Sequence, residues 1–168
     1  MIVIPKIQQR DFYFGSALSM FFKHNQDTHP SIIEPIEDCS QIIKMATNTT
    51  KDFYIFMKYT TKQKSLENKD KRSWTFPLSS KDKKIISEYY SDDTPLYLFF
   101  ICGYDEKYKT GEIAILTYSE YNEIKHKSSV TINIKKPRDK HFNVHKGKAE
   151  KDTFSIPTNR IEKRITDI

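Results

Sequence analysis

The stretch that decides the fold is residues 51–80, KDFYIFMKYTTKQKSLENKDKRSWTFPLSS. Its first part, residues 53–59, is dense in aromatic and branched side chains, which is typical of a buried β-strand. Side chains alternate between the two faces of a strand. One face is therefore predicted to carry Phe53, Ile55 and Met57, and the other Tyr54, Phe56 and Lys58.

Lys58 is the one charged residue of this apolar strand. Lysine is rarely buried, and its aliphatic stem commonly packs against apolar surface while the ammonium group reaches water. We expect that arrangement for Lys58. The alternative is a lysine that belongs to a functional site.

Residues 60–73 are polar and rich in lysine. They are expected to form an exposed basic loop or the tip of a hairpin that returns through Trp74 and Phe76. Ser79 and Asp82 then have the spacing of a capping box, with Asp in place of the usual Glu, and predict the start of a helix. The buried face of that helix is expected to carry Ile85, Ile86, Tyr89 and Tyr90.

A helix and two further strands are predicted before this stretch. Asp11 is a plausible N-cap for a helix whose apolar face holds Phe14, Ala17, Leu18, Phe21 and Phe22. Residues 2–4 are expected to form a short edge strand or an extended arm. Residues 31–38 read as a strand that Pro35 confines to an edge or a bulge. With residues 41–47 and 53–59 it predicts an antiparallel meander.

Two more strands are predicted after the second helix. Residues 96–103 form the most apolar run of the chain and are expected to be the central strand, paired with residues 111–117. Thr117 and Glu120 form a second capping box, which opens a short helix through residue 124. Residues 128–168 are expected to add a strand-rich extension, with a last short helix that Thr158 or Asn159 caps and that runs to residue 165.

Together these elements predict one α+β or α/β domain over residues 1–168. Its mixed central sheet is expected to be flanked by two or three helices. The order is a helix, three strands, a helix, two strands, a short helix and C-terminal strands.

Composition favours an anionic partner. The 168 residues carry a formal net charge of +6, which suits nucleic acid or a membrane surface, although an inert basic surface gives the same charge. No run approaches the roughly 20 apolar residues that a membrane span needs, and no signal peptide is visible, so a cytoplasmic protein without a membrane partner is expected. Cys39 and Cys102 are then expected to be free thiols.

Motifs for catalysis are scarce. The sequence has no GxSxG, P-loop, HExxH or CxxC motif and only four glycines. His141 and His145 are four residues apart, but an extended segment separates them by about 13 Å, too far to share one metal. Zinc requires three or four ligands, and no others cluster nearby. We therefore expect no metal site and no small-molecule ligand, and assign no catalytic residue.

The order helix, three strands, helix, strand over residues 11–125 resembles the PD-(D/E)xK superfamily of restriction-endonuclease-like nucleases. Lys58 would match the lysine of that family, and Glu34, Glu37 and Asp38 cluster around the first strand. The resemblance implies Mg²⁺ held by carboxylates and a water oriented for phosphodiester attack. Phe56 stands two positions before Lys58, where the family has Asp, Glu or occasionally Gln, which implies the fold with a degenerate site.

Two basic segments, residues 58–84 and 135–148, lead to nucleic acid as the favoured partner, either DNA or RNA. Lysine and arginine supply phosphate contacts, and aromatic side chains can stack on bases. The expected contact residues are Lys58, Lys62, Lys64, Lys71, Arg72, Trp74, Lys135, Lys136, Arg138 and Lys140.

Three hypotheses for the function follow. The first is a basic, nucleic-acid-associated protein, degenerate in catalysis, of a phage or bacterial defence system. The second is a small protein–protein interaction factor of such a system, with tyrosines and Trp74 at its contact surface. The third is an active Mg²⁺-dependent nuclease that uses Lys58 with Glu34, Glu37 or Asp38. Only the third requires a cofactor, which is Mg²⁺.

Overall fold

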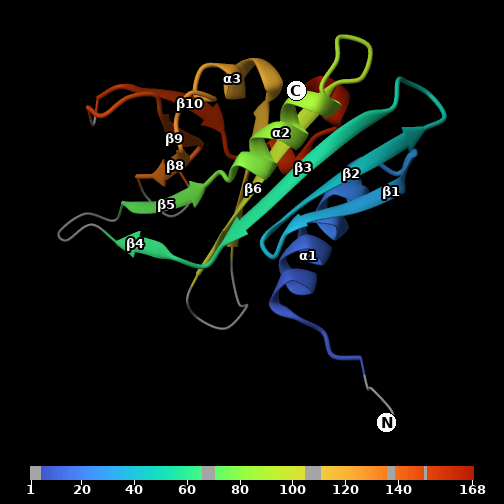
Figure 1. Ribbon diagram of the computed structural model, residues 1–168, viewed down its shortest axis with the longest axis horizontal. Helices are drawn as coiled ribbons and strands as arrows, with labels where there is room; N and C mark the ends of the chain where they lie inside the picture. Colours follow the sequence, from blue (N-terminus) through green and yellow to red (C-terminus); the bar gives the residue numbers. More distant parts are fainter. Residues whose placement is uncertain (1–4, 66–70, 105–110, 136–138, 150) are drawn as a thin grey trace.

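Two five-stranded β-sheets pack together in the computed structural model, which describes residues 5–65, 71–104, 111–135, 139–149 and 151–168. Sheet A has the order β1-β2-β3-β6-β7, and sheet B has the order β10-β9-β8-β5-β4. Figure 1 shows sheet A running diagonally on the right and sheet B on the left. The strands of sheet A are β1 (Thr28–Glu37), β2 (Ser40–Thr47), β3 (Phe53–Thr60), β6 (Leu96–Gly103) and β7 (Gly111–Thr117). The strands of sheet B are β4 (Gln63–Ser65), β5 (Arg72–Pro77), β8 (Ser129–Ile134), β9 (His141–His145) and β10 (Thr153–Pro157).

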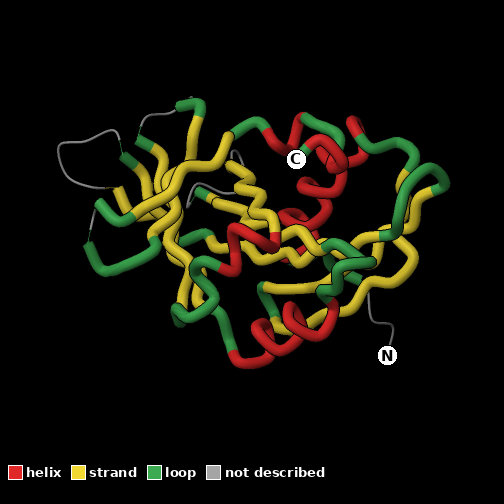
Figure 2. The backbone as a smooth tube through the Cα atoms, turned by 90° about the horizontal axis from the view of Figure 1, so that it is seen from above, coloured by secondary structure: helices red, strands yellow, loops and turns green. Residues whose placement is uncertain are grey.

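Helices lie on opposite sides of sheet A (Figure 2). The elements are α1 (Gln9–His24), α2 (Ser80–Tyr89), α3 (Tyr118–Asn122) and the two short 3₁₀ turns η1 (Arg160–Glu162) and η2 (Ile165–Asp167). The predicted single α+β domain, with a mixed sheet and three helices, is confirmed.

The predicted meander is present, since β1 pairs with β2 and β2 with β3, both antiparallel. The register shifts next to Pro30 and Pro35 in β1, which is the edge strand that a proline predicts. The next elements along the chain, β4, β5 and α2, lie outside sheet A. The following strand, β6, belongs to sheet A and pairs with β3 in parallel. The middle strand is therefore β3, and the most apolar strand, β6, lies beside it between β3 and β7.

The alternation predicted for β3 is confirmed. Phe53, Ile55 and Met57 pack toward α1 in one buried cluster, and Phe56 packs into a second cluster between the two sheets. That second cluster contains the apolar side chains of sheet B and the inner faces of α2 and α3. Sheet A is thus covered on both faces, and sheet B is covered on one.

Local sequence patterns predicted the starts of two helices correctly. Ser79 and Asp82 form the predicted capping box of α2, and Thr117 and Glu120 that of α3. At α1 the prediction was wrong, because Gln8 is the N-cap and Asp11 is the third helical residue, which accepts a hydrogen bond from the Gln8 N–H at 2.8 Å.

Other expectations are revised at the edges of the fold. The predicted last helix is replaced by the two 3₁₀ turns, and Asn159 makes no side-chain cap. Residues 2–4 lie outside the described residues. Residues 60–73 do contain a hairpin, in which Gln63–Ser65 pair with Arg72–Trp74. The strand-rich region after residue 128 joins that hairpin to form sheet B, a second sheet that the sequence analysis did not foresee.

In the described part of the chain, no helix has the length and apolar character that crossing a membrane requires.

Candidate nucleic-acid interface

Sheet B turns one face to the core and leaves the other open. The core side carries Trp74, Phe76, Val130, Ile132, Ile134, Phe142, Val144 and Ile156, at even positions of β5, β8, β9 and β10. The odd positions therefore point away from the core. Hydrogen bonds across neighbouring strands confirm that these residues share a face: Thr75 Oγ1 lies 3.2 Å from Thr131 Oγ1, and Ser155 Oγ donates to Asn143 Oδ1 at 3.0 Å.

This outer face is polar and cationic. Its described members, including those at the strand ends, are Lys64, Lys71, Ser73, Thr75, Pro77, Ser129, Thr131, Asn133, Lys135, His141, Asn143, His145, Lys151, Thr153, Ser155 and Pro157. No Asp or Glu stands at any of these described positions. We call this set the outer face of sheet B.

A hollow of about 380 Å³ lies on this face. Its lining residues come from four neighbouring segments of sheet B and all occupy odd positions. They are Lys71, Asn133, Lys135, Asn143, Lys151 and Thr153. The pairing of β9 with β10 brings Thr153 opposite His145, and the pairing of β8 with β9 brings Asn133 opposite Asn143.

Asn133 is the most deeply buried residue of this lining, with 3% of its surface exposed. Its Nδ2 atom lies 2.5 Å from Nε2 of His145. Its Oδ1 atom is the only buried side-chain N or O atom of the described residues that has no hydrogen-bond partner. Buried polar atoms are nearly always paired, so an unpaired one on a residue that lines a hollow calls for an explanation, and a bound ligand is one such explanation.

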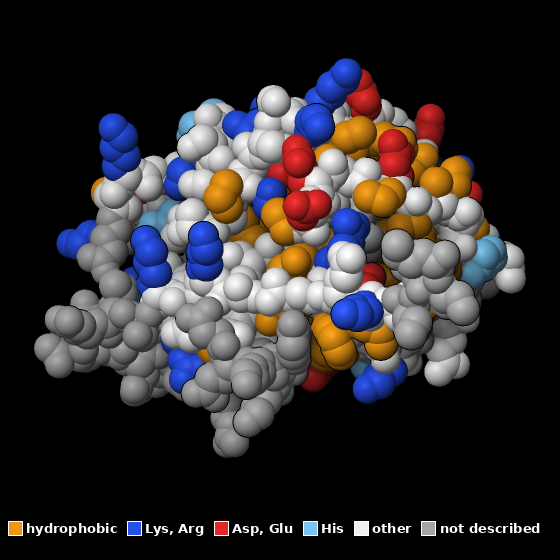
Figure 3. All heavy atoms as spheres, turned by 60° about the horizontal axis from the view of Figure 1, so that its bottom comes forward, with side chains coloured by type: hydrophobic (Ala, Val, Ile, Leu, Met, Phe, Trp, Pro, Cys, Tyr) orange, Lys and Arg blue, Asp and Glu red, His pale blue; other side chains and the backbone are white. Residues whose placement is uncertain are grey.

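The described acidic groups near sheet B do not line the hollow, although Asp152 stands in the chain between two lining residues, Lys151 and Thr153. Glu123, just after α3, forms an ion pair with Lys146, whose Nζ atom lies 2.8 Å from Glu123 Oε2, and this contact raises the pKa of the lysine. The Asp152 carboxylate lies beside Gly147 and helps to raise the pKa of Lys146. Asp139 lies in the loop between β8 and β9, where its Oδ1 accepts the backbone N–H of Lys140. Figure 3 shows Lys and Arg side chains on the left of the view, on the side where sheet B lies, and most of the visible acidic side chains toward the middle and right.

The structure brings three of the predicted contact residues together. Lys64, Lys71 and Lys135 belong to the outer face of sheet B, and Lys71 and Lys135 line the hollow. Lys62 and Lys140 are exposed in the loops that enter β4 and β9. The predicted residues Lys136 and Arg138 lie outside the described residues.

Two predicted contact residues point the other way. Trp74 is fully buried, and its indole N–H donates to the Gly103 carbonyl at 2.8 Å. It therefore cannot stack on a base or contact a protein partner, which corrects both expectations. Arg72 lies on the core side of β5, with its guanidinium carbon 4.8 Å from the centre of the Tyr104 ring.

Lys58 was also predicted wrongly. Only 5% of its surface is exposed, and its ammonium group lies 2.6 Å from Asp82 Oδ2 instead of reaching water. Ser40 donates to the other oxygen of Asp82 at 2.6 Å, and the Ser79 backbone N–H donates to Oδ2 at 3.1 Å. Lys58 is an internal ion-pair partner and does not contribute to the interface.

Two of the residues predicted for a magnesium site, Lys58 and Glu34, are held in separate contacts. Lys58 pairs with Asp82, whereas Glu34 accepts a 2.5 Å hydrogen bond from the Tyr89 hydroxyl. Within the described residues, no three His, Cys, Asp or Glu side chains are grouped so that they could hold a metal ion. His141 and His145 lie on β9, in the extended conformation that the sequence predicts.

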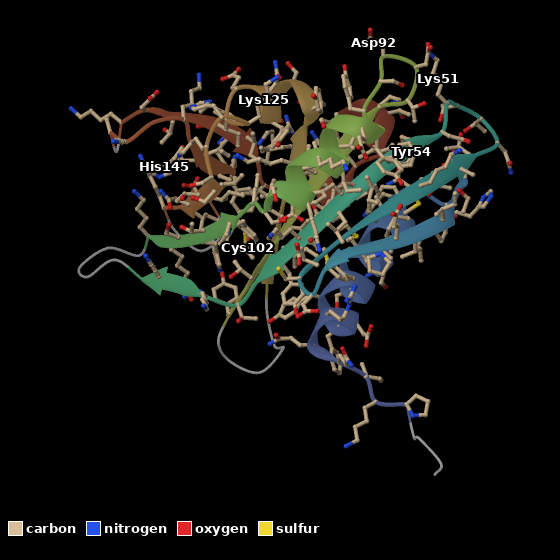
Figure 4. The ribbon with its side chains drawn as sticks, in the orientation of Figure 1. Lys51, Tyr54, Asp92, Cys102, Lys125 and His145 are labelled. Carbon is tan, nitrogen blue, oxygen red and sulfur yellow. The ribbon has the colours of Figure 1, made fainter. Side chains whose placement is uncertain are left out.

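Four residues of the hollow were not predicted from the sequence, namely Asn133, Asn143, Lys151 and Thr153. A signal was present, because β8 and β9 alternate strictly between apolar even positions and polar odd positions, and β10 does so up to its last residue, Pro157. Strands with the same alternation predict a sheet with one buried and one polar face. Figure 4 labels His145 on the side of the molecule that sheet B occupies.

Comparison with known proteins found no matching family model, no matching curated protein and no matching solved structure. The resemblance to the PD-(D/E)xK superfamily stays a prediction, and the function is argued from the geometry of sheet B.

Proposed function

We propose that this chain is a cytoplasmic, non-enzymatic protein that binds nucleic acid through the outer face of sheet B. The observation that carries the proposal is the gathering of lysine, histidine, asparagine and hydroxyl side chains on one sheet face whose described positions hold no carboxylate. Lysines attract phosphates and release counterions, and amides and hydroxyls donate hydrogen bonds to phosphate oxygens. The free cysteines Cys39 and Cys102 agree with a reducing compartment.

The chemistry of this face favours the phosphate backbone over the bases. None of its described positions carries Phe, Tyr or Trp, and its only rings besides proline are the small imidazoles of His141 and His145. Proteins that bind unpaired bases without sequence preference usually stack them on aromatic side chains, and that platform is lacking here. Binding is therefore expected to depend strongly on salt and weakly on sequence.

The test is a salt series with a labelled duplex and a labelled single strand, read by fluorescence anisotropy between roughly 50 and 200 mM salt. Wild-type affinity should fall steeply as salt rises. A variant with Lys71, Lys135 and Lys151 all changed to Gln should bind more weakly, and the slope of log K against log salt should shrink by about 2 to 3.

A matched control changes Lys51, Lys84 and Lys125 to Gln. These exposed lysines lie outside sheet B, and the control removes the same number of charges. It should keep most of the wild-type affinity and slope. Equal losses in the two triple variants would show that only net charge matters, and wild-type binding that is absent or insensitive to salt would refute the proposal.

A further inference from the structure

The lining of the hollow offers hydrogen-bond donors from every side. Lys71, Lys135 and Lys151 contribute ammonium groups, Thr153 a hydroxyl, and Asn133 and Asn143 amides. A volume of about 380 Å³ falls within the range of small-ligand sites. A ligand that matches such a lining is anionic and rich in acceptor oxygens.

The two amides can both present their NH₂ groups to such a ligand. Asn143 Oδ1 already accepts the Ser155 hydroxyl at 3.0 Å, so its NH₂ group remains for the hollow. Rotation of the Asn133 amide by a half turn exchanges its two polar atoms. Oδ1 would then accept an N–H from His145 Nε2, and the NH₂ group would face the hollow. An anion in the hollow thus favours the rotated amide. In that orientation the oxygen of Asn133, which has no partner at present, accepts a hydrogen bond from His145, and the NH₂ group donates to the anion.

The donors and charges that line the hollow indicate what kind of phosphate it takes. A phosphodiester inside a strand carries one negative charge and two free oxygens, because its other two oxygens are esterified. A phosphomonoester carries about −1.5 to −2 charges and three acceptor oxygens. Three lysines and two amides around one recess suit the monoester better.

We infer that this hollow binds a terminal phosphate, so that the protein recognises a phosphorylated end of the nucleic acid strand lying on the outer face of sheet B. The inference rests on the proposed function, because the bound strand supplies the phosphate. Lys71, Lys135 and Lys151 neutralise its charge, and Asn133 and Asn143 donate to its oxygens.

The experiment compares one oligonucleotide sequence with a 5′-phosphate, with a 3′-phosphate or with hydroxyl groups at both ends, by anisotropy at constant salt. One phosphorylated form should bind about tenfold more tightly than the hydroxyl form, as expected for additional charge-assisted hydrogen bonds. Which form gains affinity identifies the end that is recognised. Equal affinity for all three forms, with steep salt dependence intact, would overturn the terminal-phosphate inference and leave the proposed function standing.

Asn143→Asp provides the matching variant, because it keeps an acceptor for Ser155 and replaces the donor NH₂ by a charged oxygen. It should lose the tenfold preference for the phosphorylated end. Asn48→Asp, at an exposed turn position between β2 and β3, adds the same charge and should retain the preference. Retention of the preference in Asn143→Asp would overturn the assignment of the hollow.

Titration with inorganic phosphate separates the two proposals if no oligonucleotide binds. Saturable shifts of the Asn133 and Asn143 side-chain NH₂ resonances, absent with chloride at equal ionic strength, would show that the hollow takes free phosphate. The proposed function and the strand-end inference would both then be overturned. The absence of shifts and of oligonucleotide binding would remove the anion site altogether.

Discussion

Sheets A and B differ in where their charged side chains lie and in whether these are paired within the protein. Sheet A is covered on both faces, and the charged groups that face its core are neutralised within the protein, as Lys58 is by Asp82. Sheet B is covered on one face and gathers lysines on the other, at positions without a described carboxylate. A buried charge must be paired inside the fold, whereas charges collected on an open face add to a surface potential that attracts an anionic partner. The most unusual lysine of the sequence therefore serves the structure, and ordinary surface lysines carry the proposed function.

The largest effect is expected at the buried pair. Asp82→Ala leaves the Lys58 ammonium group without its counterion and removes the capping box of α2. The free energy of unfolding should fall by about 3 to 5 kcal/mol, measured by urea denaturation. The double variant Lys58→Met with Asp82→Leu removes both charges and should recover most of that loss. A loss below about 1 kcal/mol in the single variant would mean that the pair is not buried as described.

A charge reversal on the open face should change binding without changing stability. Lys135→Glu, at the end of β8, should weaken binding of an oligonucleotide roughly tenfold at low salt, since it replaces a phosphate contact by repulsion. Its free energy of unfolding should stay within about 0.5 kcal/mol of wild type. Lys125→Glu, outside sheet B, is the control, and a loss of affinity as large as that of Lys135→Glu would erase the distinction between the two regions.

The ion pair at the end of β7 should give a smaller, pH-dependent effect. Burial opposes ionisation of Glu120, but the bidentate contact with Arg160 and the Thr117 backbone N–H outweigh it, so the pKa of Glu120 lies below its ordinary value. A lowered pKa stabilises the fold above the unfolded-state value of about 4.3, and this stability is lost as pH falls through the folded-state value.

Arg160→Gln should therefore cost about 1 kcal/mol at neutral pH and progressively less in acid. Thermal unfolding from neutral to strongly acidic pH would measure the difference between variant and wild type. A difference that stays constant across that range would assign the effect to the 2.8 Å hydrogen bond from Arg160 to the Ile115 carbonyl instead of to the charge of Glu120.

The smallest effect on stability is expected at Tyr89 of α2, whose hydroxyl donates a hydrogen bond to Glu34 of β1. This hydrogen bond, with partial burial, raises the pKa of Tyr89 to about 12. The contribution to stability is complete below the ordinary pKa of about 10 and is lost as pH rises through the folded-state value.

Tyr89→Phe should lower the free energy of unfolding by about 0.5 to 1 kcal/mol at neutral pH, and the difference should vanish in strong alkali. The variant keeps the ring that packs edge-on against Tyr54, so it isolates the hydroxyl. Tyrosinate absorbance should show one group fewer titrating at high pH. An unchanged titration curve would contradict the assignment.

The sequence could predict what depends on nearby residues. The capping boxes at Ser79 and Thr117 require only residues three positions apart, and the β1–β2–β3 meander requires only short turns between apolar runs. The two faces of β3 followed from its alternation alone. These features are encoded within a few residues, so they can be read without knowing the rest of the fold.

What the sequence could not predict depends on partners far along the chain. Trp74 is buried because its strand pairs with β8 and its N–H reaches Gly103, and neither neighbour is close to it in sequence. Lys58 can be buried because Asp82 of α2 lies beside it and pairs with its charge. The sequence around Asp82 predicts only that this residue caps a helix. The hollow likewise joins Lys71 to Lys151 through three strand pairings, β5–β8, β8–β9 and β9–β10, and the first of these joins segments more than 50 residues apart.

The pairing of β5 with β8 determines when sheet B can form during translation. Thr75 and Thr131 are opposite each other although 56 residues separate them, and β4 and β5 alone would make a two-stranded ribbon of marginal stability. During translation, a nascent chain that has not yet released residues 129–157 from the ribosome lacks three of the five strands of sheet B. The cationic recess therefore cannot assemble before residues 129–157 have emerged, and the ribosomal and messenger RNA that surround the growing polypeptide meet it only after that point.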